Sequence, residues 1–187
     1  MLGMERKSIM KAEEIIDKYY EGQDELKQLL LLHSRQVADK AMSVLDLHPE
    51  IEADRAFVYE AAMLHDIGIV RTDAPGIGCR GTYPYICHGM LGAEILRSEG
   101  LPRHARVAER HTGTGLTVKS IQKQGLPLPL MDFLPETIEE QIVCYADKFF
   151  SKSKPHRMKT EEEVRQMLGR FPDADLEQWD KWTCLFG

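Results

Sequence analysis

A histidine and an aspartate stand side by side at the end of an apolar run, in the stretch Ala61-Ala62-Met63-Leu64-His65-Asp66-Ile67-Gly68. A buried charge is costly unless something balances it, and a cation suits an imidazole and a carboxylate together. Neighbouring helix residues point about 100° apart, so both side chains reach one ion only near a helix end. Gly68 supplies an end signal two residues later. The pair therefore predicts a metal site at the end of a helix.

Four more residues with metal-ligand chemistry lie at the inner seam or the end of a predicted helix: His33, His88, His111 and Asp147. Taken alone, a histidine on an apolar helix face is more often a core residue bonded to a backbone carbonyl. Six such residues are much harder to explain as independent core residues. Imidazole and carboxylate without thiolate suit Fe, Mn, Co, Ni, Zn or Mg, and one ion rarely takes six protein ligands. The set therefore predicts two divalent ions.

Apolar residues recur three or four positions apart along most of the chain, which is the spacing of one helix face. Capping boxes formed by Thr137 with Glu140 and by Thr160 with Glu163 mark two helix starts. Residues 71–87 are rich in glycine and proline, which predicts a loop, either a connector or a functional segment. No segment shows convincing strand alternation, so the sequence predicts an all-α fold. The predicted helices cover about 11–20, 24–45, 53–65, 88–99, 102–111 and 137–150, with a short helix within 115–135 and two more after 160.

Composition bounds the class of protein and of partner. The chain of 187 residues is 43% hydrophobic and 29% charged, which is typical of one globular domain. The net charge of −6 argues against a nucleic-acid polymer or an anionic membrane as partner, although a local basic pocket remains compatible with a phosphate. We therefore expect a small phosphorylated substrate. Four cysteines without a CxxC pair, no signal peptide and no apolar run near the ~20 residues of a membrane span predict a cytoplasmic protein.

The order of the candidate ligands resembles the HD-domain superfamily, whose pattern is a histidine, an adjacent His-Asp pair and a distant aspartate on a helical core. Here these positions are His33, His65-Asp66 and Asp147, and His65-Asp66-Ile67-Gly68 spells the motif of the HDIG subgroup. The resemblance covers about residues 24–152. Both ends lie outside it, and we expect a single domain over 1–187, with an HD core at about 24–152 and a C-terminal helical extension at about 153–187.

The two-metal members of that superfamily carry two further histidines between the His-Asp pair and the last aspartate. His88 and His111 lie in that interval, 23 residues apart. The resemblance therefore implies a binuclear site in which Asp66 bridges two ions. By the same analogy, the remaining ligands are His33, His65 and Asp147 for the first ion and His88 and His111 for the second.

Several branches of the superfamily fit less well. The His-Asp pair is not followed by the Glu-Asp of guanosine-tetraphosphate hydrolases, and the Gly-Tyr-Pro signature of cyclic-di-GMP phosphodiesterases is missing after His111. Diadenosine tetraphosphate hydrolases usually carry a lysine shortly after the pair, whereas this chain has Ile69, Val70 and Arg71. The match to that branch is incomplete.

The leading hypothesis is a metal-dependent phosphohydrolase that acts on a small phosphate ester or nucleotide through a metal-activated water. Asp66 and His65 are its predicted catalytic residues, and no protein nucleophile is required. Lys148, Arg71 and Arg110 lie near the ligands in sequence and are candidates for substrate binding, although solvated surface charge explains each of them too. Lys148 is favoured because it adjoins Asp147.

Two alternatives use the same chain differently. Some HD-domain proteins with a similar ligand set are mixed-valent di-iron oxygenases that cleave C–C or C–P bonds with dioxygen. A non-catalytic nucleotide-binding module is the third hypothesis, but degenerate members of that kind typically lack the metal ligands. The ligand set alone separates neither the hydrolase from the oxygenase nor one metal from another.

Overall fold

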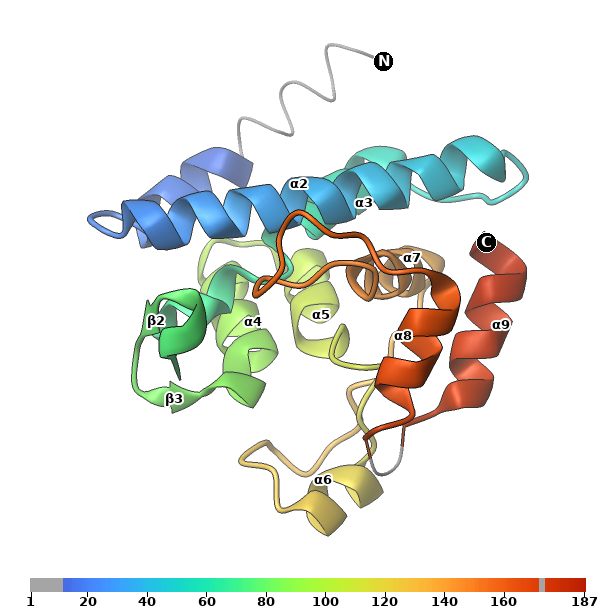
Figure 1. Cartoon of the computed structure of the whole chain (residues 1–187). Coiled ribbons are helices and arrows are strands. Elements are labelled where there is room, and N and C mark those ends of the chain that lie inside the picture. The colour runs from blue at the N-terminus through green and yellow to red at the C-terminus, as the bar shows by residue number, and fades with distance from the viewer. Residues whose placement is uncertain (1–11, 172–173) are drawn as a thin grey trace.

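The computed structural model describes residues 12–171 and 174–187, and in that part the chain is mainly helical (Figure 1). This confirms the predicted all-α class. Residues 12–19 form a first helix, while Lys11, where that helix was predicted to begin, lies outside the described residues. The other helices are α2 (Asp24–Leu47), α3 (Arg55–Leu64), α4 (His88–Ser98), α5 (Pro102–Arg110), α6 (Val118–Gln124), α7 (Ile138–Asp147), α8 (Glu161–Leu168) and α9 (Leu176–Phe186).

Two predicted helix starts have the hydrogen bonds expected of a capping box. Thr137 accepts from the amide of Glu140 at the start of α7, and the Glu140 side chain accepts from the amide of Thr137. Thr160 and Glu163 make the same reciprocal pair at the start of α8. These bonds satisfy amides that a helix start leaves without an intrahelical partner. Both predicted capping boxes are therefore confirmed.

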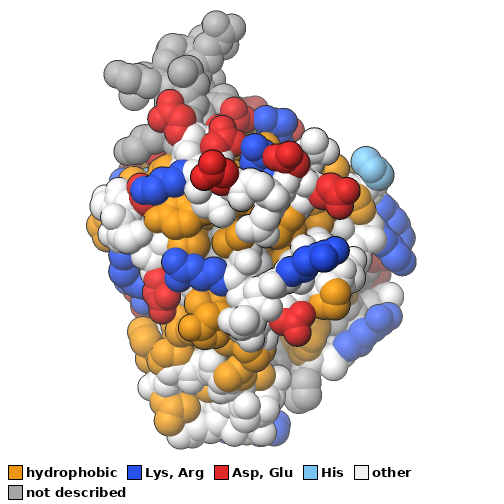
Figure 2. All heavy atoms as spheres, turned by 90° about the vertical axis from the view of Figure 1, so that its left-hand side faces the viewer, with side chains coloured by type: hydrophobic (Ala, Val, Ile, Leu, Met, Phe, Trp, Pro, Cys, Tyr) orange, Lys and Arg blue, Asp and Glu red, His pale blue; other side chains and the backbone are white. Residues whose placement is uncertain are grey.

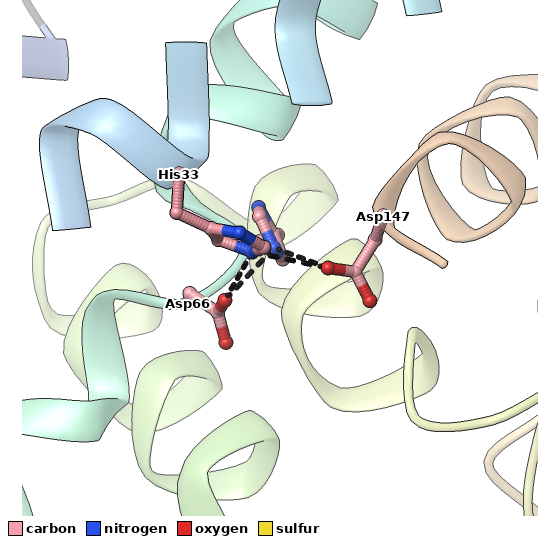
Figure 3. Close-up of side chains that lie close together, drawn as sticks. His33, Asp66 and Asp147 are labelled. Atoms are coloured by element: carbon pink, nitrogen blue, oxygen red, sulfur yellow. Dashed lines mark ion pairs between the residues drawn. The ribbon is translucent and has the colours of Figure 1, made fainter. Parts of the chain in front are cut away.

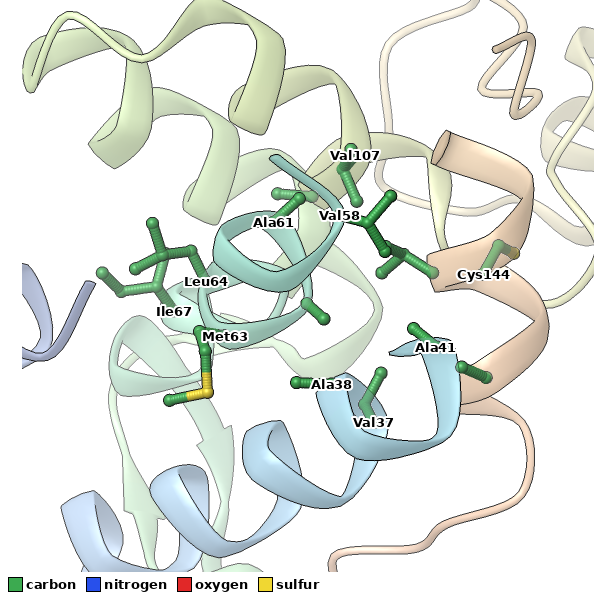
Figure 4. Close-up of a cluster of buried hydrophobic side chains, with 14 of the residues drawn as sticks. Val37, Ala38, Ala41, Val58, Ala61, Met63, Leu64, Ile67, Val107 and Cys144 are labelled. Atoms are coloured by element: carbon green, nitrogen blue, oxygen red, sulfur yellow. The ribbon is translucent and has the colours of Figure 1, made fainter. Parts of the chain in front are cut away.

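The apolar seams of the central helices meet in one core. Helix α2 packs against α3 and α7, and α4 packs against α5. Figure 4 shows side chains from α2, α3, α5 and α7 meeting in this core, where Val37, Val58 and Cys144 are fully buried. Because helices from distant parts of the sequence share this contact, the core fixes their inner faces relative to one another. Those inner faces carry the candidate ligands.

The segment predicted as a loop contains short regular elements. Strand β1 (Thr72–Ala74) pairs antiparallel with β2 (Cys79–Arg80) and parallel with β3 (Tyr83–Pro84). Short 3-10 turns at Ile67–Arg71 (η1) and Tyr85–Cys87 (η3) lie between these strands and helices α3 and α4, and one at Pro75–Ile77 (η2) joins β1 to β2. Strands of two or three residues are too short for apolar alternation to reveal, which is why the sequence did not predict them.

The C-terminal helices pack onto α7. Tyr145 stacks on Trp179 with ring centroids 5.1 Å apart, and the Trp182 indole donates a 3.1 Å hydrogen bond to Gln141. The division into an HD core and a C-terminal extension within one domain stays a prediction. Among the described residues, no helix combines the length and the apolar character needed to cross a bilayer.

Gly68 has a different role from the one predicted. Helix α3 already ends at Leu64, and Gly68 lies within η1, which packs directly on α4. A Cβ added at Gly68 would overlap the carbonyl oxygen of His88 and the amide nitrogen of Gly92. Only glycine allows the two backbones to approach this closely.

We therefore expect Gly68→Ala to lower the free energy of unfolding by about 1–3 kcal/mol, because α4 must move away from η1. The displacement also moves His88 away from the other ligands. Gly76→Ala is the matched control, because a Cβ there meets nothing within 4 Å. Urea unfolding curves measure both variants. Equal stability of the two variants would contradict the packing role of Gly68.

Candidate metal centre

The candidate ligands from distant parts of the sequence meet at one place. They form two groups of residues, and within each group the possible ligand atoms lie within 4.8 Å of one another. Asp66 belongs to both groups. Figure 3 shows His33 extending from α2, and Asp147 extending from the end of α7, toward Asp66. The first group is His33, His65, Asp66 and Asp147, and the second is Asp66, His88 and His111.

The end of α3 explains how two neighbouring residues point at one spot. His65 is the C-cap of α3 and keeps helical dihedrals. Asp66 has φ −105° and ψ 10°, so the chain leaves the α-helical path there and enters η1. This change of direction turns the Asp66 carboxylate toward the His65 ring, with Oδ2 and Nε2 3.0 Å apart. The predicted location of the pair at a helix end is confirmed.

Three of the histidines are held in one tautomer by the backbone. The Nδ1–H groups of His65, His88 and His111 donate to the carbonyl three residues earlier, at 2.6, 2.7 and 2.7 Å. In the neutral ring, the proton on Nδ1 leaves Nε2 with a free lone pair, and Nε2 points into the cluster. Such a bond to the second ring nitrogen is the usual support for a metal-binding histidine.

The two oxygens of Asp66 face the two groups separately. Oδ2 lies 3.0 Å from Nε2 of both His33 and His65. Oδ1 lies 3.4 Å from Nε2 of His88 and 3.5 Å from Nε2 of His111. A fully buried carboxylate with one oxygen toward each group has the geometry of a bridging ligand.

The cluster lacks hydrogen bonds that a buried polar group normally has. Among the described residues, Oδ1 of Asp66 and the Nε2 atoms of His33 and His65 are buried without a hydrogen-bond partner. The Nε2 atoms of His88 and His111 face each other at 3.0 Å although neither carries a proton when Nδ1 does. Neighbouring ligands at about 2.1 Å from an ion are roughly 3.0–3.4 Å apart in octahedral or tetrahedral coordination. The observed separations fit cations between these atoms.

Burial and the carboxylates set the charges of the rings. Burial lowers the pKa of His88 to about 3, so this ring is neutral, as a ligand must be. Burial also opposes the charged form of His65, but the negative charges of Asp66 and Asp147 raise its pKa to about 9, so this ring must lose a proton before Nε2 can bind an ion. Burial alone would raise the pKa of Asp66, yet the charges of Lys152 and His65 hold it well below its usual value. Asp66 is therefore ionised at neutral pH.

A cavity of about 460 Å³ opens from the cluster to solvent. Its lining includes His88, His111 and Asp147, together with Tyr85, Lys148 and Lys152. The Lys148 ammonium donates to Asp147 Oδ2 at 2.6 Å and to the carbonyl of His111 at 2.7 Å. The Lys152 ammonium pairs with Asp66 Oδ2. The two lysine ammonium groups thus balance the two carboxylates of the centre.

Sequence reasoning missed two residues of this cavity. The Tyr85 ring stacks on the His88 ring with centroids 4.7 Å apart, and Lys152 reaches Asp66 from beyond the end of α7. Lys152 lies five residues after Asp147 in the sequence, and this short separation is the signal that could have marked it as a residue of the cavity. Tyr85 lies in the segment predicted as a loop, three residues before His88, and nothing in its spacing marked it.

The structure brings one of the three predicted substrate-binding cations to the cavity. Lys148 lines it, whereas Arg71 and Arg110 are absent from its lining. The Arg71 guanidinium pairs with Glu94 at 3.2 Å on an exposed surface. Arg110 donates to Glu136 at 2.8 Å and to the carbonyl of Leu134 at 2.7 Å. Both arginines therefore already have acceptors within the chain.

These features define a helical protein with a buried His/Asp metal centre. The chain belongs to the HD domain family, which matches residues 30–152. The predicted resemblance is thereby confirmed. Family membership and the ligand geometry together indicate divalent-metal binding at this cluster.

The chain is also similar in sequence to several individual proteins. The chain is 39% identical over 149 residues to a protein of Picrophilus torridus, and 36% identical over 149 residues to one of Thermoplasma volcanium; both are named tRNA (cytidine(56)-2'-O)-methyltransferase. Each match covers 79% of this chain but only 37% and 38% of these relatives. An uncharacterised protein of Methanocaldococcus jannaschii is 40% identical over 104 residues, or 55% of this chain and 54% of that protein. The comparison with solved structures gave no match.

These relatives overturn two predictions. The assignment as a phosphohydrolase of a small phosphate ester or nucleotide is wrong, because the named relatives are tRNA methyltransferases. The expectation of a small phosphorylated substrate and no nucleic-acid polymer is wrong for the same reason, since tRNA is a polymer. The ligand set determines which cations fit, and it leaves open what those cations act on.

Proposed function

We propose that this chain is the metal-binding part of a tRNA-modifying enzyme and acts on tRNA in connection with ribose 2'-O-methylation. The observation that carries the proposal is its similarity to two proteins named tRNA methyltransferases, at 39% and 36% identity. More than half of each relative lies outside the match. We therefore assign to this chain a metal-dependent role beside methyl transfer, with transfer itself assigned to the remainder of such an enzyme.

The candidate ligands would hold two divalent ions, with Asp66 shared between them. Bound ions of this kind supply Lewis acidity toward phosphate and hydroxyl oxygens. The geometry that supports the pair is the separate orientation of the two Asp66 oxygens. The other proposed ligands are His33, His65 and Asp147 on one side and His88 and His111 on the other.

The residues around the ligands would position an RNA phosphate. Lys148 holds the end of α7 to the carbonyl of His111 and so keeps Asp147 beside the cluster. The Lys152 ammonium lies in the cavity lining, where a phosphate oxygen would find a cationic donor. Tyr85 covers the His88 ring on the cavity side and limits access of water to it.

Deletion of the gene for this chain tests the proposal. We expect tRNA from the deletion strain to contain less 2'-O-methylcytidine, as measured by mass spectrometry of digested nucleosides. The wild-type gene should restore the modification, and Asp66→Ala should not. Asp73→Ala is the matched control, because Asp73 is an exposed aspartate of β1 outside the ligand groups. Full methylation in the deletion strain would contradict the proposal.

A further inference from the structure

A basic groove lies beside the metal cavity. This groove, of about 420 Å³, is formed by the segment 151–159 and α8, and Ser151 and Ser153 line both it and the metal cavity. The two hollows therefore adjoin at these serines. Of the charged side chains in the groove, one is acidic, Glu163, and four are basic: Lys154, Arg157, Lys159 and Arg170.

Most of this positive charge is not neutralised within the described part of the chain. Glu163 pairs with Arg157 and also caps α8. Lys159 donates at 3.0 Å to the carbonyls of Lys148 and Phe150, which are uncharged acceptors. In residues 12–171 and 174–187, neither Lys154 nor Arg170 has a carboxylate at ion-pair distance, and both are exposed. The groove thus keeps a surplus of cations.

The surplus of positive charge in the groove contrasts with the net charge of the whole chain. The whole chain has a net charge of −6, so its cations are outnumbered. On the face shown in Figure 2, acidic and basic side chains alternate with apolar ones, and no field of one sign dominates. The groove has four cations to one carboxylate, whereas in the adjoining metal cavity Lys148 and Lys152 are paired with Asp147 and Asp66. The unbalanced positive charge is therefore concentrated in a groove that adjoins the metal cavity.

We propose that this groove binds the phosphate backbone of an RNA strand and leads that strand to the metal cavity. Successive cations along a groove match the regular phosphates of a strand, and the Ser151 and Ser153 hydroxyls can donate to phosphate oxygens at the junction. A free nucleotide would use the cavity alone and would need no cations along the groove. The inference rests on the proposed function, since it takes tRNA as the polymer that supplies the strand.

The test compares charge reversals inside and outside the groove. Lys154→Glu, Arg170→Glu and the double variant alter the groove, and Lys181→Glu makes the same change on the exposed surface of α9. Affinity for a fluorescently labelled, unmodified tRNA transcript is measured over a series of salt concentrations. Metal content by mass spectrometry and circular dichroism verify that each variant keeps its centre and fold.

We expect the double variant to bind the transcript about tenfold or more weakly at low salt, with a slope of log affinity against log salt reduced by about 0.7 for each lost phosphate contact. Lys181→Glu should bind as the wild type does. If the wild type binds the transcript and the groove variants bind it equally well, the proposal that the groove binds RNA is overturned. The proposed function would then still stand. Absence of wild-type binding to the transcript, or a preference for anionic lipid vesicles over it, would overturn both.

Discussion

Asp66→Ala is expected to release bound metal more completely than any other single change in the cluster. One Asp66 oxygen faces His33 and His65, and the other faces His88. Removal of this carboxylate takes a ligand from both groups and leaves two cations without the negative charge between them. Protein loaded with Mn, then passed over a desalting column, is assayed by mass spectrometry of the metal. We expect two ions per wild-type chain and none, or nearly none, in the variant.

Two other substitutions serve as comparisons for the metal content of Asp66→Ala. His88→Ala removes a ligand from one group only, so we expect it to keep about one ion per chain. Asp73→Ala removes an exposed aspartate outside both groups and should keep two. Retention of two ions by Asp66→Ala, with a circular dichroism spectrum like that of the wild type, would show that Asp66 does not bridge.

The convergence of the candidate ligands could be predicted from the sequence because their constraints are local. His65 and Asp66 converge because α3 ends just before them and the chain changes direction at Asp66. Apolar spacing places His33 on the inner seam of α2. His88 and His111 likewise begin or follow a helix, so their place on the inner faces followed from periodicity. The packing of α2 on α3 and α7 then brings these faces together.

Features that depend on contacts between distant backbones could not be predicted. Gly68 was interpreted as a helix end, whereas its close approach to His88 and Gly92 appears only when η1 packs on α4. The strand pairings around Thr72–Ala74 involve two or three residues each, below the length at which side-chain alternation is informative. The cavity position of Lys152 depends on how the chain turns after α7, and no periodic signal encodes that turn.

The predicted partner was wrong for a related reason. Net charge is an average over the whole chain, and a value of −6 says little about one groove. Arg157, Lys159 and Arg170 lie on two segments that become neighbours only in the folded protein. The ligand set does not identify the substrate either, because a metal centre that polarises oxygen can act on a polymer or on a small molecule.

Metal loading is expected to raise the thermal unfolding midpoint of this chain by a large amount. The native centre gathers carboxylates and imidazoles that an unfolded chain holds apart, so divalent ions bind the native state preferentially. An ion present at a hundred times its dissociation constant stabilises the native state by about 2.7 kcal/mol. Two ions then contribute roughly 5 kcal/mol, which corresponds to a rise of roughly 10–20 °C for a domain of this size.

Differential scanning calorimetry of chelator-treated and Mn-loaded protein measures this rise. The ammonium of Lys152 pairs with Asp66 Oδ2 and would have to leave that oxygen when an ion binds, so the observed rise is net of that exchange. Asp66→Ala should show little or no rise, while Lys181→Glu should show the full one, since Lys181 lies on α9 outside the ligand groups. An equal rise in Asp66→Ala and in the wild type would mean that the stabilising ion binds away from this cluster. In that case Oδ1 of Asp66 and Nε2 of His65 would need another partner, and the assignment of the centre would fail.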